Sequence, residues 1–138
     1  MPVVILGADL AAYLDAQLAS LTIDTNLFVS RLPDAPDACV ALLEGSGAQP
    51  VLNMDALAKV DNPTVQVRVR DVSYPAGYAM VMSVFKTLHG LAETTLTPGT
   101  AYVKAIWAMQ SPVHIGRDEK ERHEWSLNLR VVWENANR

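Results

Sequence analysis

The sequence has a single cysteine, few aromatic residues and no long hydrophobic run. One cysteine, Cys39, cannot form an intrachain disulfide, so the composition favours a reducing, intracellular environment. The longest uncharged stretch, 72–85, contains Pro75 and Gly77 and is too short to cross a bilayer. The apolar start MPVVILGADL has no basic residues before it and no A-x-A cleavage site, so we expect no signal peptide. A protein without a membrane anchor is predicted.

Basic residues are also scarce, since 11 lysines and arginines stand against 15 aspartates and glutamates and give a net charge of −4. A protein that binds nucleic acid phosphates normally carries an excess of basic residues, so this composition argues against a nucleic-acid-binding protein. Hydrophobic residues make up 50% of the chain, a rich share for a small monomer that hints at apolar surface covered by a partner. The length and the absence of repeats or linkers predict one domain, 1–138, with one core.

Familiar catalytic and metal-binding motifs are missing. The sequence contains no H-E-x-x-H, no CxxC and no G-x-S-x-G, and the GSG at 45–47 lacks the lysine of a phosphate-binding loop. Cys39 lies in an apolar run, where a thiol usually packs as a small inert group. We therefore predict a protein that is not an enzyme, with no catalytic residue, no cofactor and no metal site.

The densest charge lies in HIGRDEKERHEWSLNLRVVW, which runs from His114 to Trp133. Four side chains there could supply nitrogen and oxygen ligands: His114, Glu119, His123 and Glu124. Their spacing matches no zinc pattern, and Gly116 disfavours a continuous helix that would place them on one face. The alternation of charge sign is typical of a surface loop with local ion pairs. A loop is predicted, and a small metal-dependent enzyme remains the alternative from another class.

Two helices are expected from apolar periodicity. The first begins near Asp9, a plausible N-cap, and its apolar face contains Leu10, Tyr13, Leu14, Leu18 and Leu21. The second has Pro75 at its start and Gly90 as its stop, and its apolar stripe contains Tyr78, Val81, Met82, Phe85 and Leu88.

Strict alternation predicts two strands. In TVQVRVR, Val65, Val67 and Val69 point one way and Gln66, Arg68 and Arg70 the other; in EWSLNLRVVW, Trp125, Leu127, Leu129, Val131 and Trp133 share a face opposite Ser126, Asn128 and Arg130. NLFVSRLP, ACVALLE and AYVKAIWAM predict further strands, whereas GSGAQPVLNMDALAKVDNP indicates a long connection. The fold class is therefore α+β: an antiparallel or mixed sheet of four to five strands, packed on one face by two helices. The other face is either solvated or covered by another chain.

Four segments occur in an order that resembles a known family. LPDAPDACVALLEGSG is followed by NPTVQVRVRD, by a helix beginning YPAGYAMV and by IGRDEKERHEWSLNLRV. This ordered set, from Leu32 to Val132, is similar to the minor capsid or tail-terminator family of long-tailed bacteriophages. The first helix matches only in its apolar pattern, and the start PVVILG departs from the family.

The resemblance implies a subunit that closes into a ring, usually a hexamer, at the head-proximal end of a phage tail. Such a ring stops tail-tube polymerisation and supports head–tail joining. Its partners would be further copies of the chain, the tail-tube protein and neck or head-completion proteins, in a virion assembled in the host cytoplasm. An acidic lumen would let DNA pass without sequence-specific binding. Another neck component, such as a connector, a stopper or a minor capsid protein, is the alternative.

The same resemblance suggests a role for the charged loop in contacts with a neighbouring subunit or tail partner. The interface candidates are Arg117, Asp118, Lys120 and Arg122, together with Arg68 and Arg70 of the alternating strand. Charge pairs that become desolvated at such a boundary select partners more sharply than pairs on an open surface. A loop that is simply solvated is the alternative.

Overall fold

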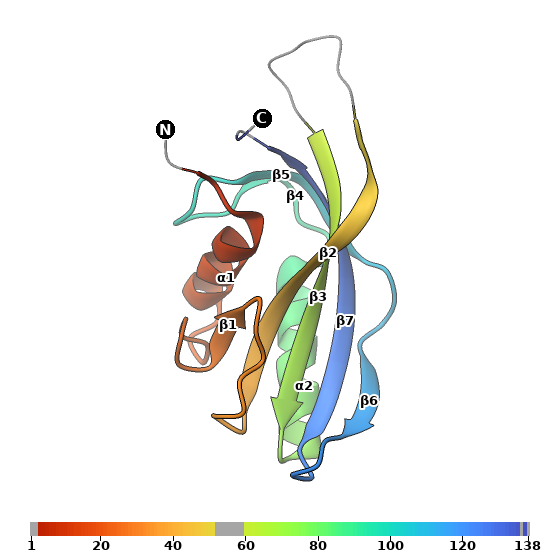
Figure 1. Ribbon diagram of the computed structural model, residues 1–138. Helices are drawn as coiled ribbons and strands as arrows, with labels where there is room; N and C mark the ends of the chain where they lie inside the picture. Colours follow the sequence, from red (N-terminus) through yellow and green to blue (C-terminus); the bar gives the residue numbers. More distant parts are fainter. Residues whose placement is uncertain (1–2, 52–59, 136, 138) are drawn as a thin grey trace.

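The computed structural model describes residues 3–51, 60–135 and 137, and the side chains of this set except those of 46–51 (Figure 1). The chain forms α1 (Leu6–Gln17), β1 (Leu27–Val29), β2 (Cys39–Val51), β3 (Val60–Asp71), α2 (Tyr74–Leu88), β4 (Ala92–Thr95), β5 (Tyr102–Ala108), β6 (Val113–Arg117) and β7 (His123–Glu134). The two ends of the described chain lie at the same end of the molecule, where the side chain of Asn137 bonds to the backbone of Val4.

One mixed sheet holds all seven strands, in the order β1-β2-β3-β7-β5-β4, with β6 also paired to β7. The β1–β2 pair is parallel and the other pairs are antiparallel. One edge of the long strand β7 is shared, because β5 pairs with residues 129–134 and β6 with residues 123–126. The predicted α+β class is confirmed, and the sheet is larger than the four to five strands expected.

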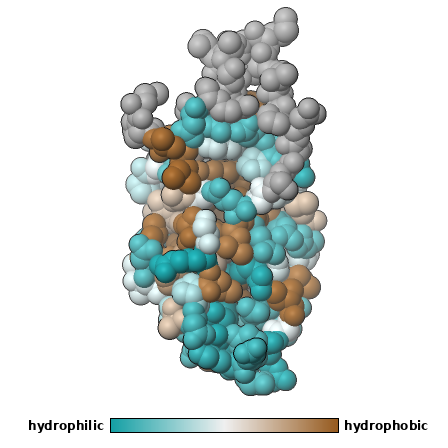
Figure 2. All heavy atoms as spheres, viewed as in Figure 1, coloured by the Kyte–Doolittle hydropathy of each residue, from teal (hydrophilic) through white to brown (hydrophobic). Residues whose placement is uncertain are grey.

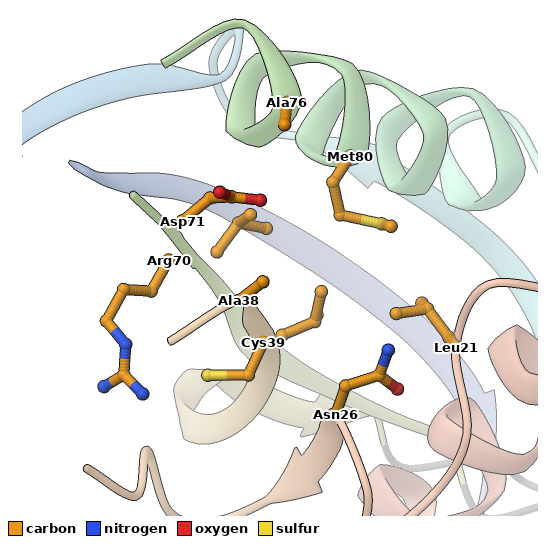
Figure 3. A pocket seen from close by; sticks show the side chains of 10 residues that line it. Leu21, Asn26, Ala38, Cys39, Arg70, Asp71, Ala76 and Met80 are labelled. Carbon is orange, nitrogen blue, oxygen red and sulfur yellow. The ribbon is translucent and has the colours of Figure 1, made fainter. Parts of the chain in front are cut away.

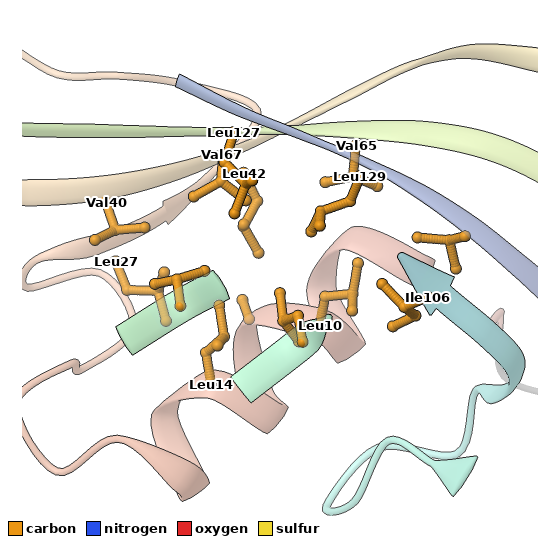
Figure 4. Packing of buried hydrophobic residues seen from close by; sticks show 14 of the residues in the cluster. Leu10, Leu14, Leu27, Val40, Leu42, Val65, Val67, Ile106, Leu127 and Leu129 are labelled. Carbon is orange, nitrogen blue, oxygen red and sulfur yellow. The ribbon is translucent and has the colours of Figure 1, made fainter. Parts of the chain in front are cut away.

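Both helices pack on the same face of the sheet and enclose the core (Figure 4). The alternation of β3 and β7 is confirmed, since Val65, Val67, Val69, Trp125, Leu127, Leu129, Val131 and Trp133 are all buried in this core. Leu10 and Leu14 of α1 and Val81, Val84 and Leu88 of α2 cover them. In Figure 1 α2 lies behind the sheet, so the viewer looks onto the face that neither α1 nor α2 covers. We call this the open face.

The helix α1 begins at Leu6, before the predicted N-cap. Asp9 instead lies in the first turn, and its Oδ2 accepts hydrogen bonds from the backbone N–H groups of Thr100 (3.0 Å) and Ala101 (2.8 Å). The aspartate that resembled a cap thus joins the helix to the turn between β4 and β5. Its long-range partners carry no local sequence signal, which explains the misplaced start.

The buried face of α2 differs from the predicted stripe. Tyr78 is 48% exposed, while Gly77 is buried. A Cβ on Gly77 would come within 2.8 Å of Nε1 of Trp125, so only glycine lets the helix approach the indole this closely. The face of α2 that contacts the sheet is therefore centred closer to Gly77 than predicted. Val84 is buried in the core, although it was not part of the predicted apolar stripe.

Where the structure describes it, the predicted long connection between β2 and β3 is strand. β2 continues to Val51 and β3 begins at Val60, with register shifts on either side of Ala48; residues 52–59 lie outside the described residues. Glycine and alanine in this stretch erase the period-two pattern, although the backbone still pairs. The sequence analysis also missed two short strands, β4 and β6. β4 reads AETT and therefore lacks the apolar side chains that would indicate a strand.

Candidate interaction site

The turn between β6 and β7 is built by Asp118. Its Oδ1 accepts hydrogen bonds from the backbone N–H groups of Lys120 (2.9 Å) and Arg122 (3.0 Å), and Glu121 adopts a positive φ of 61° to close the turn. The backbone bond from Arg122, the strongest influence, helps to hold the pKa of Asp118 below its ordinary value. The charged segment of the sequence is thus a structured turn whose carboxylate stays ionised.

Arg122 joins this turn to the loop 34–37. Its Nε donates to Asp118 Oδ2 at 2.7 Å, Nη2 to Asp34 Oδ1 at 3.0 Å, and Nη1 to the Asp34 carbonyl at 2.5 Å and to Asp37 Oδ1 at 3.3 Å. Only 4% of Arg122 is exposed. The planar guanidinium fork satisfies several oxygens at once, which a lysine could not do. The bonds of Asp34 to Lys120 and then to Arg122 also lower the pKa of Asp34.

Arg70 holds the same loop from β3. Its Nη2 donates to the Pro36 carbonyl at 2.6 Å and its Nε to the Asp37 carbonyl at 3.2 Å, and 3% of the residue is exposed. The PDAPD and GRDEKER segments, about eighty residues apart in sequence, therefore meet in one place. We call the loop 34–37, the turn 117–122 and Arg70 the charged corner.

The predicted interface residues divide into buried and exposed members. Arg70, Asp118 and Arg122 bind within their own chain, as described above. Arg117 pairs with Glu121 at 2.8 Å, Lys120 pairs with Asp34, and Arg68 lies 3.5 Å from Glu124 on the open face. Arg117 and Lys120 are the most exposed of the six. Figure 2 shows hydrophilic side chains over the end of the molecule where this turn lies.

His114 and His123 meet across the β6–β7 hairpin, with Nε2 of the first 3.0 Å from Nδ1 of the second. Tyr74 and Trp125 pack around the pair, with ring centroids 4.9–5.4 Å from their neighbours. Glu119 and Glu124 do not join them, and the described residues contain no group of three or more histidine, cysteine or acidic side chains placed to hold a metal ion. The sequence showed both histidines but not the aromatic residue from α2 that completes the cluster.

A pocket of about 180 Å³ lies on the helix-covered face near the start of β2 (Figure 3). Val40 and Val69 line it from the sheet, Ala76 and Met80 from α2, and Leu21 and Asn26 from the loop before β1. Its volume is below the ~300 Å³ at which small-molecule sites begin. Cys39 also lines it, and burial raises the pKa of this thiol, which keeps it protonated and unreactive. The pocket has the size of a receptor for a single side chain.

The sequence profile of the family described as "Bacteriophage tail terminator protein" matches residues 9–135. This chain belongs to that family. The match spans both halves of the charged corner and reaches back to α1, beyond the segments that carried the resemblance in the sequence. The tail terminator family consists of phage structural proteins, so this tail terminator is a structural component of a phage tail or neck.

A solved structure described as "Virion of native gene transfer agent (GTA) particle" contains a chain of the same fold. The two chains share 18% sequence identity with a TM-score of 0.58, and the match covers 91% of this tail terminator and 93% of the other chain. No curated protein matches the sequence significantly. In the described part of the chain, none of the helices has the length and apolar character needed to span a bilayer.

Proposed function

We propose that this tail terminator closes into a ring, usually a hexamer, at the head-proximal end of the tail tube. There it stops further polymerisation of the tube and supports the joining of tail and head. The family match over residues 9–135 carries this proposal. The uncovered open face of the sheet supports it, because a subunit of a ring needs surface for its neighbours.

The charged corner is the proposed contact for a tail-tube or neck partner. Asp118, Arg122 and Arg70 hold the corner through bonds inside the chain, and Arg117 and Lys120 lie at its surface in exposed ion pairs with Glu121 and Asp34. Preformed charges of this kind lose little side-chain entropy on binding. Arg68, on the open face, is proposed to contribute at the same subunit or partner boundary.

The remaining assignments follow from composition and family. The protein is proposed to work as one domain, 1–138, without catalysis, cofactor or metal, in a virion whose tail and neck are assembled in the host cytoplasm. Its net charge of −4 suits a ring through which DNA passes without sequence-specific binding. Head-completion proteins would meet the surface of the ring that faces the head.

Loss of the gene distinguishes a terminator from another neck component. Without a terminator we expect tails of uncontrolled length, measured by electron microscopy of particles. Loss of a connector, stopper or minor capsid protein would instead leave tails of normal length that fail to join heads. Complementation with the wild-type gene should restore both length and joining, and a deletion strain with normal tails and normal joining would refute the proposal.

The contribution of the charged corner is tested by a second complementation. Arg117→Ala with Lys120→Ala should fold normally but reduce the yield of joined particles by about tenfold. Lys86→Ala, which removes an exposed lysine from α2, provides the matched control and should restore full yield. Equal yields from the two variants would exclude the corner as the contact.

A further inference from the structure

Four large apolar side chains are exposed in a row along the β5–β6 border of the sheet. Trp107 is 40% exposed, Met109 51%, Val113 46% and Ile115 47%. Register places Trp107 opposite Arg130 and Val113 opposite Ser126, so these side chains lie on the open face. Figure 2 shows hydrophobic atoms at this border, beside the position of β6 in Figure 1. We call these four residues the apolar edge.

The composition of the apolar edge is that of an interface core. Tryptophan and methionine are enriched in such cores and charged residues are depleted, while charges gather at the rim. Here Arg130 and Glu124 lie on the neighbouring strand β7. β6 pairs only with β7 among the described residues, so its outer backbone also faces outward. Soluble proteins normally protect an edge strand of this kind unless another chain covers it.

A surface with complementary features lies at the other end of the same sheet. The loop Leu21–Asn26 presents Ile23, which is 36% exposed, beside the pocket of about 180 Å³. We call this loop and pocket the acceptor surface. It lies by β1 and β2 on the helix-covered face, whereas the apolar edge lies beyond β7 on the open face. One molecule therefore cannot bring its own two surfaces together.

Charge also favours contact between these two surfaces. Arg130, opposite Trp107, has no ion-pair partner within the described chain. The acceptor surface carries Asp24, whose side chain is 79% exposed and lies a loose 3.7 Å from Arg31. Opposite charges at a rim guide the correct register and like charges oppose the wrong one.

We propose that the apolar edge of one copy docks on the acceptor surface of the next, with an apolar side chain of β6 entering the pocket. The contact is head-to-tail, because it joins two different surfaces. Contacts of this kind form a closed ring when the rotation between copies closes. This inference rests on the ring of the proposed function and adds the two surfaces that build it.

Disulfide trapping tests the pairing directly. In a Cys39→Ala background, Ile115→Cys combined with Ile23→Cys should give a ladder of linked multimers when purified protein at high concentration, or assembled tails, are oxidised. Ile115→Cys alone should stay monomeric, since head-to-tail contact keeps identical residues apart. Val3→Cys with Ile23→Cys is the matched control, because Val3 is exposed but belongs to neither surface. A ladder from the control, dimers from Ile115→Cys alone, or no ladder in assembled tails would each overturn the proposal.

A second variant separates this inference from the proposed function. Trp107→Glu with Ile115→Glu should weaken self-association by at least tenfold in sedimentation analysis, or lower incorporation into tails by the same factor where free chains are monomeric. Tyr78→Glu alters an equally exposed aromatic residue on α2 and should change neither. Unchanged association or incorporation would overturn the assigned surfaces. Tail length in the gene deletion tests the terminator role independently.

Discussion

Arg122 organises the charged corner through bonds to two segments that are distant in sequence. It binds Asp118 in its own turn and Asp34 and Asp37 in the loop before β2. The sequence predicted a charged loop and named Asp118 and Arg122 as interface candidates, but it gave no role to Asp34 and Asp37. Only the exposure of each side chain separates residues that bind within the chain from residues at its surface. That exposure depends on a loop that folds back from more than eighty residues away. No local pattern contains that information.

Replacement of Arg122 should destabilise the protein more than replacement of its exposed neighbour. Arg122→Lys keeps the charge but loses the fork that reaches several oxygens, so the melting temperature should fall by several degrees. Arg117→Lys, in an exposed pair, should change it by no more than about one degree. Thermal unfolding followed by circular dichroism measures both. Equal shifts would mean that the buried pairing contributes nothing to stability.

Acid should remove the stability that Asp34 and Asp118 provide. Their pKa values are lowered in the folded protein, by Lys120 and Arg122 for Asp34 and chiefly by the Arg122 backbone for Asp118. A lowered pKa means that the folded state holds the proton less tightly than the unfolded chain, so this contribution is complete above the unfolded pKa, about 4, and is lost as pH falls through the folded value. The difference in melting temperature between wild type and Asp118→Asn should therefore be largest near pH 7 and shrink below about pH 4. A difference independent of pH would contradict this.

At the scale of elements, the sequence predicted the strands whose apolar and polar residues alternate over a short stretch. β3 and β7 alternate strictly and were predicted together with their buried faces, because one face of each is covered by helices. β4 and the second half of β2 carry no such pattern and form strands through pairing with neighbours. The apolar edge was hidden for a related reason: its four residues come from β5, β6 and the segment between them, and only pairing with β7 aligns them.

The contact between α2 and β7 depends on the absence of a side chain at Gly77. Gly77→Val would force a branched group to within about 3 Å of the Trp125 indole, and such overpacking typically costs about 1–3 kcal/mol of unfolding free energy. Ala79→Val adds a branched residue on an exposed position of the same helix and should cost under about 0.5 kcal/mol. Urea unfolding followed by tryptophan fluorescence measures both changes. Similar costs would show that helix propensity, and not the close approach, dominates.

At the scale of the whole molecule, surfaces with different chemistry point in different directions. The helices close one face, the apolar edge and acceptor surface lie at opposite ends of the sheet, and the charged corner lies at the end with the β6–β7 turn. This separation would let the proposed lateral contacts between copies and the proposed contact with a tail or neck partner form independently. The match to the family model identifies the family, whereas the proposed tasks of named residues are argued from their arrangement in space.

The net charge of the assembly leads to a prediction about DNA. Each copy adds a charge of −4, so the proposed ring would repel the phosphates of a duplex that passes through it. We expect purified protein at the concentrations where it associates to leave the mobility of duplex DNA unchanged at about 150 mM salt, and at 50 mM as well. A protein that used phosphate contacts would bind far more tightly at the lower salt, by orders of magnitude. Salt-sensitive retention would mean that basic side chains bind the phosphates, and it would contradict the proposed passage of DNA.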